Sequence, residues 1–443
     1  MSLTKKISTV KNIYYKIIII LFYIFTWASI GTNYSDLFIL TQNESITLRG
    51  VIQFSRITLN LLCFPILCFM FFMRALKYKK NSTNIILTFY IPLLCFLSQI
   101  PGLFYTANSL WNFLYILSSI NILIILNLII LYFKKDEIYF IIFITFIMMS
   151  IVFFISFTSD LILYIDGIGR FYGGITYFFS DSSGMRSSGA SRTSLILLIT
   201  YSIFSTKFIK SKILRITPLI FFTSAIILYQ SRLILGITFV FIVLNFIIRE
   251  KYTLVNLFKY LLIYIVLPIM LTFLILSTQK IRTQILIFKN CENLECHNQY
   301  QTKNITQRYK QPNFKLVSTS GRIDDWKEIF DQYSYDNNLF FGYGAQGDRY
   351  LINQSASNGL IYVFTSSGFI GIMFFLIITI TSGIQVLTYL FFNKEKRLTS
   401  YFFFIMLVFL IRSLAESSYS VFSIDLILFY TGFIFMQKYR HIT

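Results

Sequence analysis

The sequence predicts an all-α protein that crosses a membrane many times, and its composition and hydropathy pattern both indicate this. Hydrophobic residues make up 56% of the 443 residues, charged residues only 13%, and the mean hydropathy is +0.67. A soluble domain carries about 25% charged residues. The apolar residues also form long runs separated by polar connections. Together these features exclude a water-soluble enzyme, a disordered chain and a collagen-like chain.

Twelve apolar runs approach the roughly 20 residues that a helix needs to cross the hydrocarbon core of a bilayer. A large polar loop before the tenth run divides the chain into residues 1–277 with nine spans, the loop 278–366, and residues 367–443 with three spans. The predicted spans lie at about 16–31, 59–73, 84–101, 113–133, 138–157, 193–206, 213–229, 233–248, 260–277, 367–392, 399–411 and 421–436.

The placement of the basic residues predicts the orientation of these spans. When the connections are assigned alternately to two sides, one side holds 22 of the 39 basic residues and four acids. The other side holds 17 basic residues and 15 acids, so its charges nearly cancel. The positive-inside rule therefore places both termini in the cytoplasm. Because the net charge of +20 is explained by topology, it gives no support for nucleic-acid binding.

The short outer connections contain arginine and no lysine. Arginine has a planar guanidinium that binds phosphate or carboxylate through two parallel hydrogen bonds. The alternative is that these side chains only anchor the helices at the membrane interface. The seven outer arginines are Arg49, Arg56, Arg170, Arg186, Arg192, Arg232 and Arg412.

Cysteine usage predicts one feature of the large loop. Three of the five cysteines lie inside predicted spans, where they act as packing residues. Cys291 and Cys296 lie in the loop and are separated by four residues. A small disulfide loop is expected in an oxidising compartment, and zinc is the weaker alternative because only His297 is adjacent. No metal site is predicted.

Two outer segments are too long to be simple turns, and long loops of this kind often carry function. The first, about 158–192, contains a Ser/Gly-rich run with Arg186 and Arg192 and leads into the sixth span. The second, 278–366, is predicted to contain a helix over 321–330, because apolar residues recur there at helical spacing. Ser320 is a suitable N-cap for that helix.

Glycines and a charged pair follow in the C-terminal third. Gly342 and Gly344 predict a tight turn, and with Gly368 they are expected to serve the backbone. Arg412 and Glu416 are four residues apart at the end of the eleventh span, within ion-pair reach if the helix continues. We therefore expect Glu416 to pair with Arg412 in a structural role.

These motifs resemble the bacterial O-antigen polymerase and ligase superfamily. The resemblance rests on Ser320-Gly321-Arg322 with Trp326, on Gly342-Tyr343-Gly344, and on the small polar pair Ser357-Asn358 before Gly368-Phe369-Ile370-Gly371. It also includes Gly189-Ala190-Ser191-Arg192, the Ser231-Arg232 turn and the late Arg/Glu pair. It covers the topology and roughly the last 260 residues, and it depends on the order of the motifs because each one alone is weak.

The resemblance implies a multi-pass protein of the bacterial inner membrane that transfers glycans at its periplasmic face. The donor would be a glycan on undecaprenyl pyrophosphate, without a metal, nucleotide sugar or other cofactor. A chain-length regulator and a flippase would be expected partners besides the bilayer. The outer arginines fit this chemistry, because a pyrophosphate leaving group requires fixed positive charge.

The expected roles can be assigned to individual residues. The catalytic candidates are Arg322, Asp325 and Glu328. The carboxylates of Asp325 and Glu328 are the nearest candidate bases. Sugar contacts are expected from aromatic and small polar side chains. The phosphate-binding set is Arg186, Arg192, Arg232, Arg322 and Arg412, and the sugar-contacting set is Trp326, Tyr343, Ser357 and Asn358.

Three functions remain open. They can be ranked by one position at which this sequence differs from the ligases of the family. Ligases that transfer glycan to lipid A–core are similar in having a histidine eleven residues before the first glycine of the re-entering helix. Counting back from Gly368 reaches Ser357, whose hydroxyl is no base near neutral pH without help. This favours a polymerase of lipid-linked repeat units over a ligase. A transporter or flippase is the weakest alternative, because nearly all charges lie in loops rather than in spans.

Overall fold

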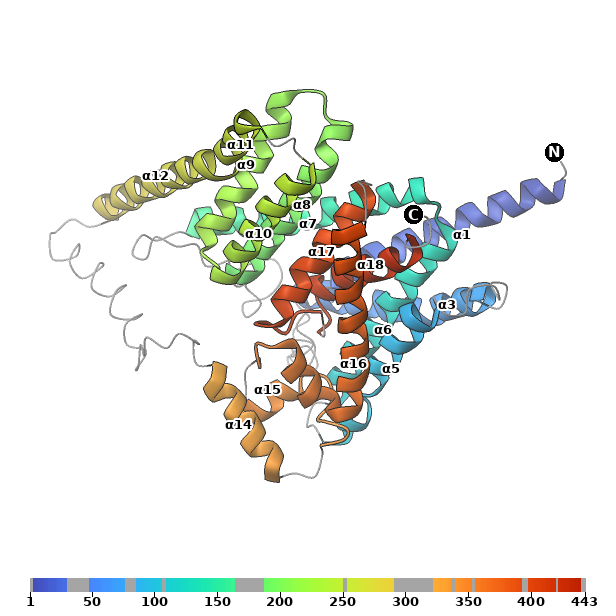
Figure 1. Cartoon of the computed structure of the whole chain (residues 1–443). Helices are drawn as coiled ribbons and strands as arrows, with labels where there is room; N and C mark the ends of the chain where they lie inside the picture. Colours follow the sequence, from blue (N-terminus) through green and yellow to red (C-terminus); the bar gives the residue numbers. More distant parts are fainter. Residues whose placement is uncertain are drawn as a thin grey trace. The chain divides into compact units, whose positions relative to one another are not determined.

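The computed structural model describes all of the chain except 1–2, 30–47, 76–84, 106–108, 164–186, 250–252, 291–321, 336–338, 353–354, 393–396, 420 and 440–443. Within the described residues every regular element is a helix and there is no strand (Figure 1). An all-α fold is thus confirmed.

The chain forms two compact units. Unit 1 contains Met1–Met148 and Arg322–Thr443, and unit 2 contains Met149–Gly321. The helices of unit 1 are α1 (Leu3–Ser29), α3 (Leu48–Ala75), η1 (Ile86–Tyr90), α5 (Ile91–Leu97), η2 (Pro101–Tyr105), α6 (Ser109–Tyr132), α14 (Arg322–Tyr335), α15 (Gly347–Ile352), α16 (Gly359–Phe392), α17 (Arg397–Ser413) and α18 (Ile424–Tyr439). Unit 2 contains α8 (Ser187–Phe208), α9 (Lys212–Tyr229), α10 (Arg232–Arg249), α11 (Leu254–Leu261), η3 (Leu262–Val266) and α12 (Leu267–Asn290), while α7 (Lys135–Leu163) contributes to both units.

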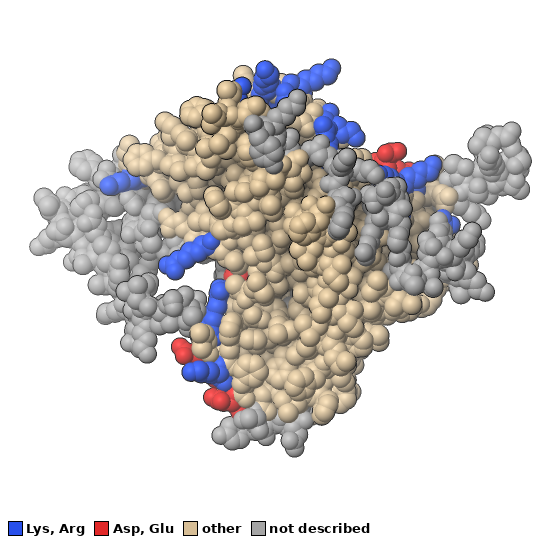
Figure 2. Space-filling view, viewed as in Figure 1, with Lys and Arg blue, Asp and Glu red and all other residues tan. Residues whose placement is uncertain are grey.

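Each of the twelve predicted spans overlaps a helix of the structure. Among the described residues, six helical segments are long and apolar enough to cross a membrane, and three shorter apolar helices lie in α1, α3 and α10. Figure 2 shows wide areas of the described surface without a charged side chain, as expected for a surface that faces lipid. A polytopic membrane protein fits these features, and the count of twelve crossings stays a prediction.

Helix α6 is the central helix of unit 1, and its sequence explains why. It is apolar around its whole circumference, so no face of it favours water. In an 18-residue stretch of its candidate span, Asn112–Tyr132, 72% of the residues are buried, and the helix packs against α1, α3, α5 and α18. By contrast, only 17% of an 18-residue stretch of the candidate span Leu254–Arg282 in unit 2 is buried.

Two of the helical segments widen into π-helix, and both do so just before a proline. Segment η1 ends two residues before Pro92, and η3 ends two residues before Pro268. Proline has no N–H to donate to the carbonyl four residues earlier, so the regular ladder loses one hydrogen bond there. A local change of hydrogen-bond register is a common way to absorb this defect.

Helix α16 is broken at Gly368, which has φ 59° and ψ −156°. The connection between α14 and α15 fills the break. The N–H groups of Tyr343 and Gly344 donate to the carbonyls of Thr365 and Ser366 at 2.8 and 3.0 Å. In return, the N–H of Phe369 donates to the carbonyl of Leu339 at 3.0 Å, and that of Ile370 to Phe340 at 3.4 Å.

Helices α14 and α15 pack on α16 through a small apolar core. The hydroxyl of Tyr333 on α14 donates to the carbonyls of Phe364 and Thr365 on α16, at 3.0 and 3.2 Å. This pairing fixes α14 against the first part of α16 and so positions its first residue, Arg322. The buried residues of this core are Ile329, Tyr333, Tyr343, Ile352, Ala356 and Phe364.

Candidate functional site

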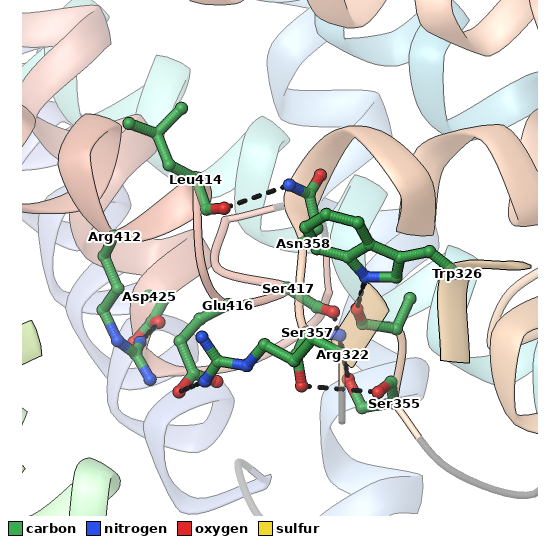
Figure 3. Close-up of polar contacts among 11 residues, drawn as sticks. Arg322, Trp326, Ser355, Ser357, Asn358, Arg412, Leu414, Glu416, Ser417 and Asp425 are labelled. Atoms are coloured by element: carbon green, nitrogen blue, oxygen red, sulfur yellow. Dashed lines mark hydrogen bonds and ion pairs between the residues drawn. The ribbon is translucent and has the colours of Figure 1, made fainter. Parts of the chain in front are cut away.

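The site is built around residues 355–358, which lead into α16 (Figure 3). Two elements bind the backbone of Ala356 from different directions. Its N–H donates to Oδ2 of Asp348 on α15 at 2.8 Å. Its carbonyl accepts a 2.7 Å hydrogen bond from the indole Nε1 of Trp326 on α14. Helices α14 and α15 therefore hold this short segment in one conformation.

The connection between α17 and α18 holds the same segment at two further points. The Ser355 and Ser417 hydroxyls are 3.0 Å apart, and the Asn358 side-chain amide donates to the carbonyl of Leu414 at 3.0 Å. The Oδ1 of Asn358 accepts the N–H groups of Leu360 and Ile361 at 2.9 and 3.1 Å. Asn358 is thus the N-cap of α16 as well as a contact between two elements.

Ser357 lies at the middle of this segment in a left-handed backbone conformation, with φ 50°. Such a φ is uncommon for residues other than glycine and costs free energy that the surrounding contacts must offset. Its side chain is half-buried, and its hydroxyl lies 3.4 Å from the carbonyl of Ser355. The position predicted to contact sugar is therefore partly accessible and conformationally fixed.

Arg322 forms an ion pair with Glu416 rather than with the neighbouring acids of its own helix. The Nη2–Oε1 distance is 3.7 Å, and the two side chains are 32% and 27% exposed. The expected Arg412–Glu416 pair is wrong. Helix α17 ends at Ser413, so Glu416 lies beyond the helix and is not placed one turn above Arg412.

Arg412 instead pairs with Asp425 of α18. Arg412 is 5% exposed and Asp425 is 2% exposed. The hydroxyl of Ser418 also donates to Oδ2 of Asp425, at 3.1 Å. A buried charge is stable only when it is paired and hydrogen-bonded, and this arrangement provides both for Asp425. The charge of Arg412, which was predicted to bind phosphate, is already matched within the protein.

The other predicted residues of this region differ in their exposure. Glu328 is exposed on α14, and Asp325 is half-buried there. Tyr343, which was expected to contact sugar, is only 2% exposed. Its ring packs 5.0 Å from that of Tyr333 and 5.7 Å from that of Tyr350, so it is part of the core.

Two acids of the site were missed from the sequence, Asp348 and Asp425. Asp425 carried a usable signal, since an acid next to a long apolar run seldom lies in lipid without a partner. No comparable signal pointed to Asp348, because nothing in the sequence around it indicates that it is buried. Burial raises the pKa of the Asp348 carboxyl, and the N–H groups of Ala356 and Arg349, which it accepts, partly offset this.

Two predicted phosphate-binding arginines lie in unit 2. Arg192 is half-buried in α8, and Arg232 is exposed as the first residue of α10. Before Arg232, α9 ends at Tyr229, whose hydroxyl donates to the buried Asp160 at 2.7 Å. Gln230 then adopts a left-handed conformation that reverses the chain. Arg186, Cys291 and Cys296 lie outside the described residues, and within the described part no cluster of metal ligands is found.

Comparison with known proteins gives one match. Residues 217–376, from α9 to the middle of α16, match the family described as O-antigen ligase. The matched segment includes the α9–α10 turn, α14, α15 and residues 355–358. No curated protein matches the chain, and no solved structure does.

Proposed function

From the match to the O-antigen ligase family, which supports membership in the O-antigen polymerase and ligase superfamily, we propose that this chain is a membrane glycosyltransferase. It polymerises oligosaccharide repeat units that are linked to undecaprenyl pyrophosphate, at the periplasmic face of the inner membrane. The growing chain moves from its carrier to the non-reducing end of another unit. The reaction uses no metal and no soluble nucleotide sugar.

One observation carries this proposal: a cation, an aromatic ring and small polar groups meet at residues 355–358. Arg322 and Trp326 lie one turn apart on α14, and Trp326 bonds directly to the segment that contains Ser357 and Asn358. A sugar linked to a pyrophosphate requires this combination. The guanidinium stabilises the leaving phosphate, the ring stacks on the sugar, and the polar groups orient its hydroxyls.

The remaining predicted residues keep their expected roles as parts of the proposal. Arg186, Arg192 and Arg232 are proposed to bind pyrophosphate. Asp325 and Glu328 are acids on the helix that begins with Arg322. The buried Arg412–Asp425 pair serves the site indirectly, by fixing the connection that contacts Ser355 and Asn358.

Ligation to lipid A–core is the second candidate, favoured by the description of the matched family. It requires the same donor and a different acceptor. Against it stands Ser357, which occupies the position where ligases resemble one another in having a histidine. A hydroxyl hydrogen-bonded only to nearby backbone does not replace an imidazole base at neutral pH.

Glycan profiling of a deletion strain distinguishes these functions. Lipid-linked and lipid A-linked fractions are separated and their chain lengths compared with the parent strain. Loss of a polymerase leaves a single repeat unit on the final anchor. Long polymer that accumulates on undecaprenyl pyrophosphate, with none on lipid A, identifies a ligase instead.

Replacement of Arg322 tests the phosphate-binding role. We expect Arg322→Ala to lower polymer formation by about 10²–10³-fold, as when one preorganised charge stabiliser is removed. Arg322→Lys should also be poor, since an ammonium cannot reproduce the bidentate geometry of a guanidinium.

The readout is polymer length in complemented deletion strains with equal membrane levels of each variant. Arg349→Ala is the matched control, because Arg349 is an exposed arginine on the neighbouring α15. Full-length polymer from Arg322→Ala would contradict the role.

A further inference from the structure

Glycosyl transfer requires a group that accepts the proton of the attacking hydroxyl. Among the described acids around residues 355–358, Asp348 and Asp425 are buried and already bound to partners within the protein. Asp325 and Glu328 lie on α14, the helix that begins with Arg322. Glu416 differs from all of these acids. It is partly exposed and lies next to Ser417, which contacts Ser355 directly.

The backbone around Glu416 is fixed although its side chain is not buried. The carbonyl of Glu416 accepts the N–H of Ser418 at 2.8 Å, and the side chain of Ser418 is bound to Asp425. The next residue, Ser417, is held by Ser355. The backbone that carries the Glu416 carboxylate is therefore held next to the segment proposed to contact sugar.

The pair that Glu416 makes with Arg322 is loose. Its 3.7 Å separation is longer than the 2.7–2.9 Å of a charge-assisted hydrogen bond. Both side chains are also about one-third exposed, and ion pairs in such surroundings contribute little to stability. A phosphate group has several oxygens that match the guanidinium fork, so it can displace a carboxylate that contacts Arg322 at this distance.

We infer that Glu416 is the general base of the transfer and that Arg322 holds it until an anionic donor arrives. This inference rests on the proposed function. The diphosphate of the donor displaces Glu416 from Arg322, and the freed carboxylate turns toward the acceptor hydroxyl. The same event therefore places the leaving group and releases the base.

The bond changes of the step balance. The acceptor oxygen forms a bond to the anomeric carbon of the donor sugar, and the bond from that carbon to the phosphate oxygen breaks. The polyprenyl pyrophosphate leaves with the electron pair. The proton of the acceptor hydroxyl passes to a carboxylate oxygen of Glu416 and then to solvent, so the carboxylate is regenerated.

The test compares Glu416→Gln with the wild-type protein in two measurements. Transfer is measured as polymer formed in the deletion strain, and anion binding as the affinity of the purified protein in nanodiscs for inorganic pyrophosphate. We expect Glu416→Gln to lower polymer by about 10²–10⁴-fold, the usual contribution of a general base. We also expect it to bind pyrophosphate several-fold more tightly, because glutamine does not compete for Arg322.

Two further variants complete the design. Asp324→Asn removes the same charge from an exposed position two residues from Arg322, and it should change neither quantity. Glu416→Asp keeps a carboxylate and should retain part of the polymer. A merely structural role for Glu416 would instead lower both pyrophosphate binding and protein stability.

Each outcome decides between the parts of the inference. Polymer near the wild-type level with Glu416→Gln overturns the role as base. Unchanged or weaker pyrophosphate binding by the same variant overturns the competition for Arg322. If deletion of the whole gene leaves polymer unchanged, the proposed function fails. The pyrophosphate affinities of the wild type and Glu416→Gln then still test whether Glu416 and a diphosphate compete for Arg322.

Discussion

Asp348 illustrates how one buried carboxylate organises a site that it does not enter. Its two oxygens accept the N–H groups of Arg349 and Ala356, and the carbonyl of Ala356 in turn accepts Trp326. Removing the carboxylate would thus loosen the link between α14, α15 and the start of α16. Asp348 is therefore a positioning residue, because it holds residues 355–358 without entering the site.

Substitution of Asp348 should affect stability in two separable ways. Asp348→Ala leaves the buried N–H of Ala356 without an acceptor, which costs about 1–3 kcal/mol. The second effect depends on pH. Because burial raises the pKa of Asp348, its contribution is fully present below the unfolded value of about 3.9 and is lost as pH rises through the folded value. Asp348→Asn does not titrate.

Thermal unfolding of the detergent-solubilised protein between pH 4 and pH 8 measures both effects. Relative to Asp348→Asn, the wild-type midpoint should fall as pH rises. A constant difference across this range would show that the carboxyl titrates normally.

At the same scale, the sequence identified some residues of the site and misassigned others. Arg322, Trp326 and Asn358 were singled out through the resemblance of their motifs, and the structure places Trp326 and Asn358 in the contacts of residues 355–358, while their roles stay predictions. The predicted partner of Glu416 was wrong, because the sequence does not show that α17 ends at Ser413, three residues before Glu416. The burial of Tyr343 was not predicted, since a turn pattern does not reveal what covers the ring.

At the scale of elements, the break in α16 is satisfied by the protein's own backbone. Four hydrogen bonds from the α14–α15 connection replace those that the helix loses around Gly368. In lipid, unsatisfied backbone groups are costly, so a broken helix requires such a partner or a bound ligand. Because the described chain fills the break, it does not resemble the ligand-binding breaks of transporters.

Glycine at position 368 should be essential for this element. Its φ and ψ fall in a region that only glycine adopts readily, and a Cβ would lie 2.4 Å from the carbonyl oxygen of Phe340. We expect Gly368→Ala to cost at least the 1–3 kcal/mol of backbone strain, and to lower the membrane level of the protein.

Gly383→Ala is the matched control on the same helix. A Cβ there meets no atom within 4 Å, and alanine is favoured over glycine inside a helix by about 1 kcal/mol. Quantitative blotting and thermal melting should therefore rank Gly383→Ala at or above the wild type. Equal behaviour of the two variants would contradict the proposed role of the break.

The elements themselves were largely predictable, while their partners were not. Long apolar runs identify these helices, because both the protein interior and the lipid require apolar side chains. All twelve predicted runs overlap helices. The three glycines were expected to serve the backbone, and Gly342, Gly344 and Gly368 do have positive φ. That residues 339–344 fill the break in α16 depends on contacts between distant parts of the chain, which periodicity does not encode.

At the scale of the whole molecule, the distribution of charge predicts the topology. Alkaline phosphatase is active only outside the cytoplasm, so fusions report the side of each connection. Fusions after Lys210 and after Lys438 should be inactive, and a fusion within the loop 278–366 should be active. Active fusions at both lysines would reverse the predicted orientation.

The two compact units were not evident from the sequence. The apolar runs predicted one continuous series of spans interrupted by a large loop. In the structure, residues 1–148 and 322–443 form one compact unit, and residues 149–321 form the other. Hydropathy cannot distinguish these arrangements, because lipid-facing and helix-facing surfaces are equally apolar.

The break in α16 also sets how deep the reaction lies in the bilayer. The part of the helix after Gly368, Phe369–Phe392, is roughly 36 Å long at about 1.5 Å per residue. That length alone traverses a hydrocarbon layer of about 30 Å. The proposed topology then places the residues before the break, and the site with them, among the lipid head groups. A polyprenyl carrier already holds its phosphates at that level, so its long tail can remain in the membrane throughout the proposed transfer.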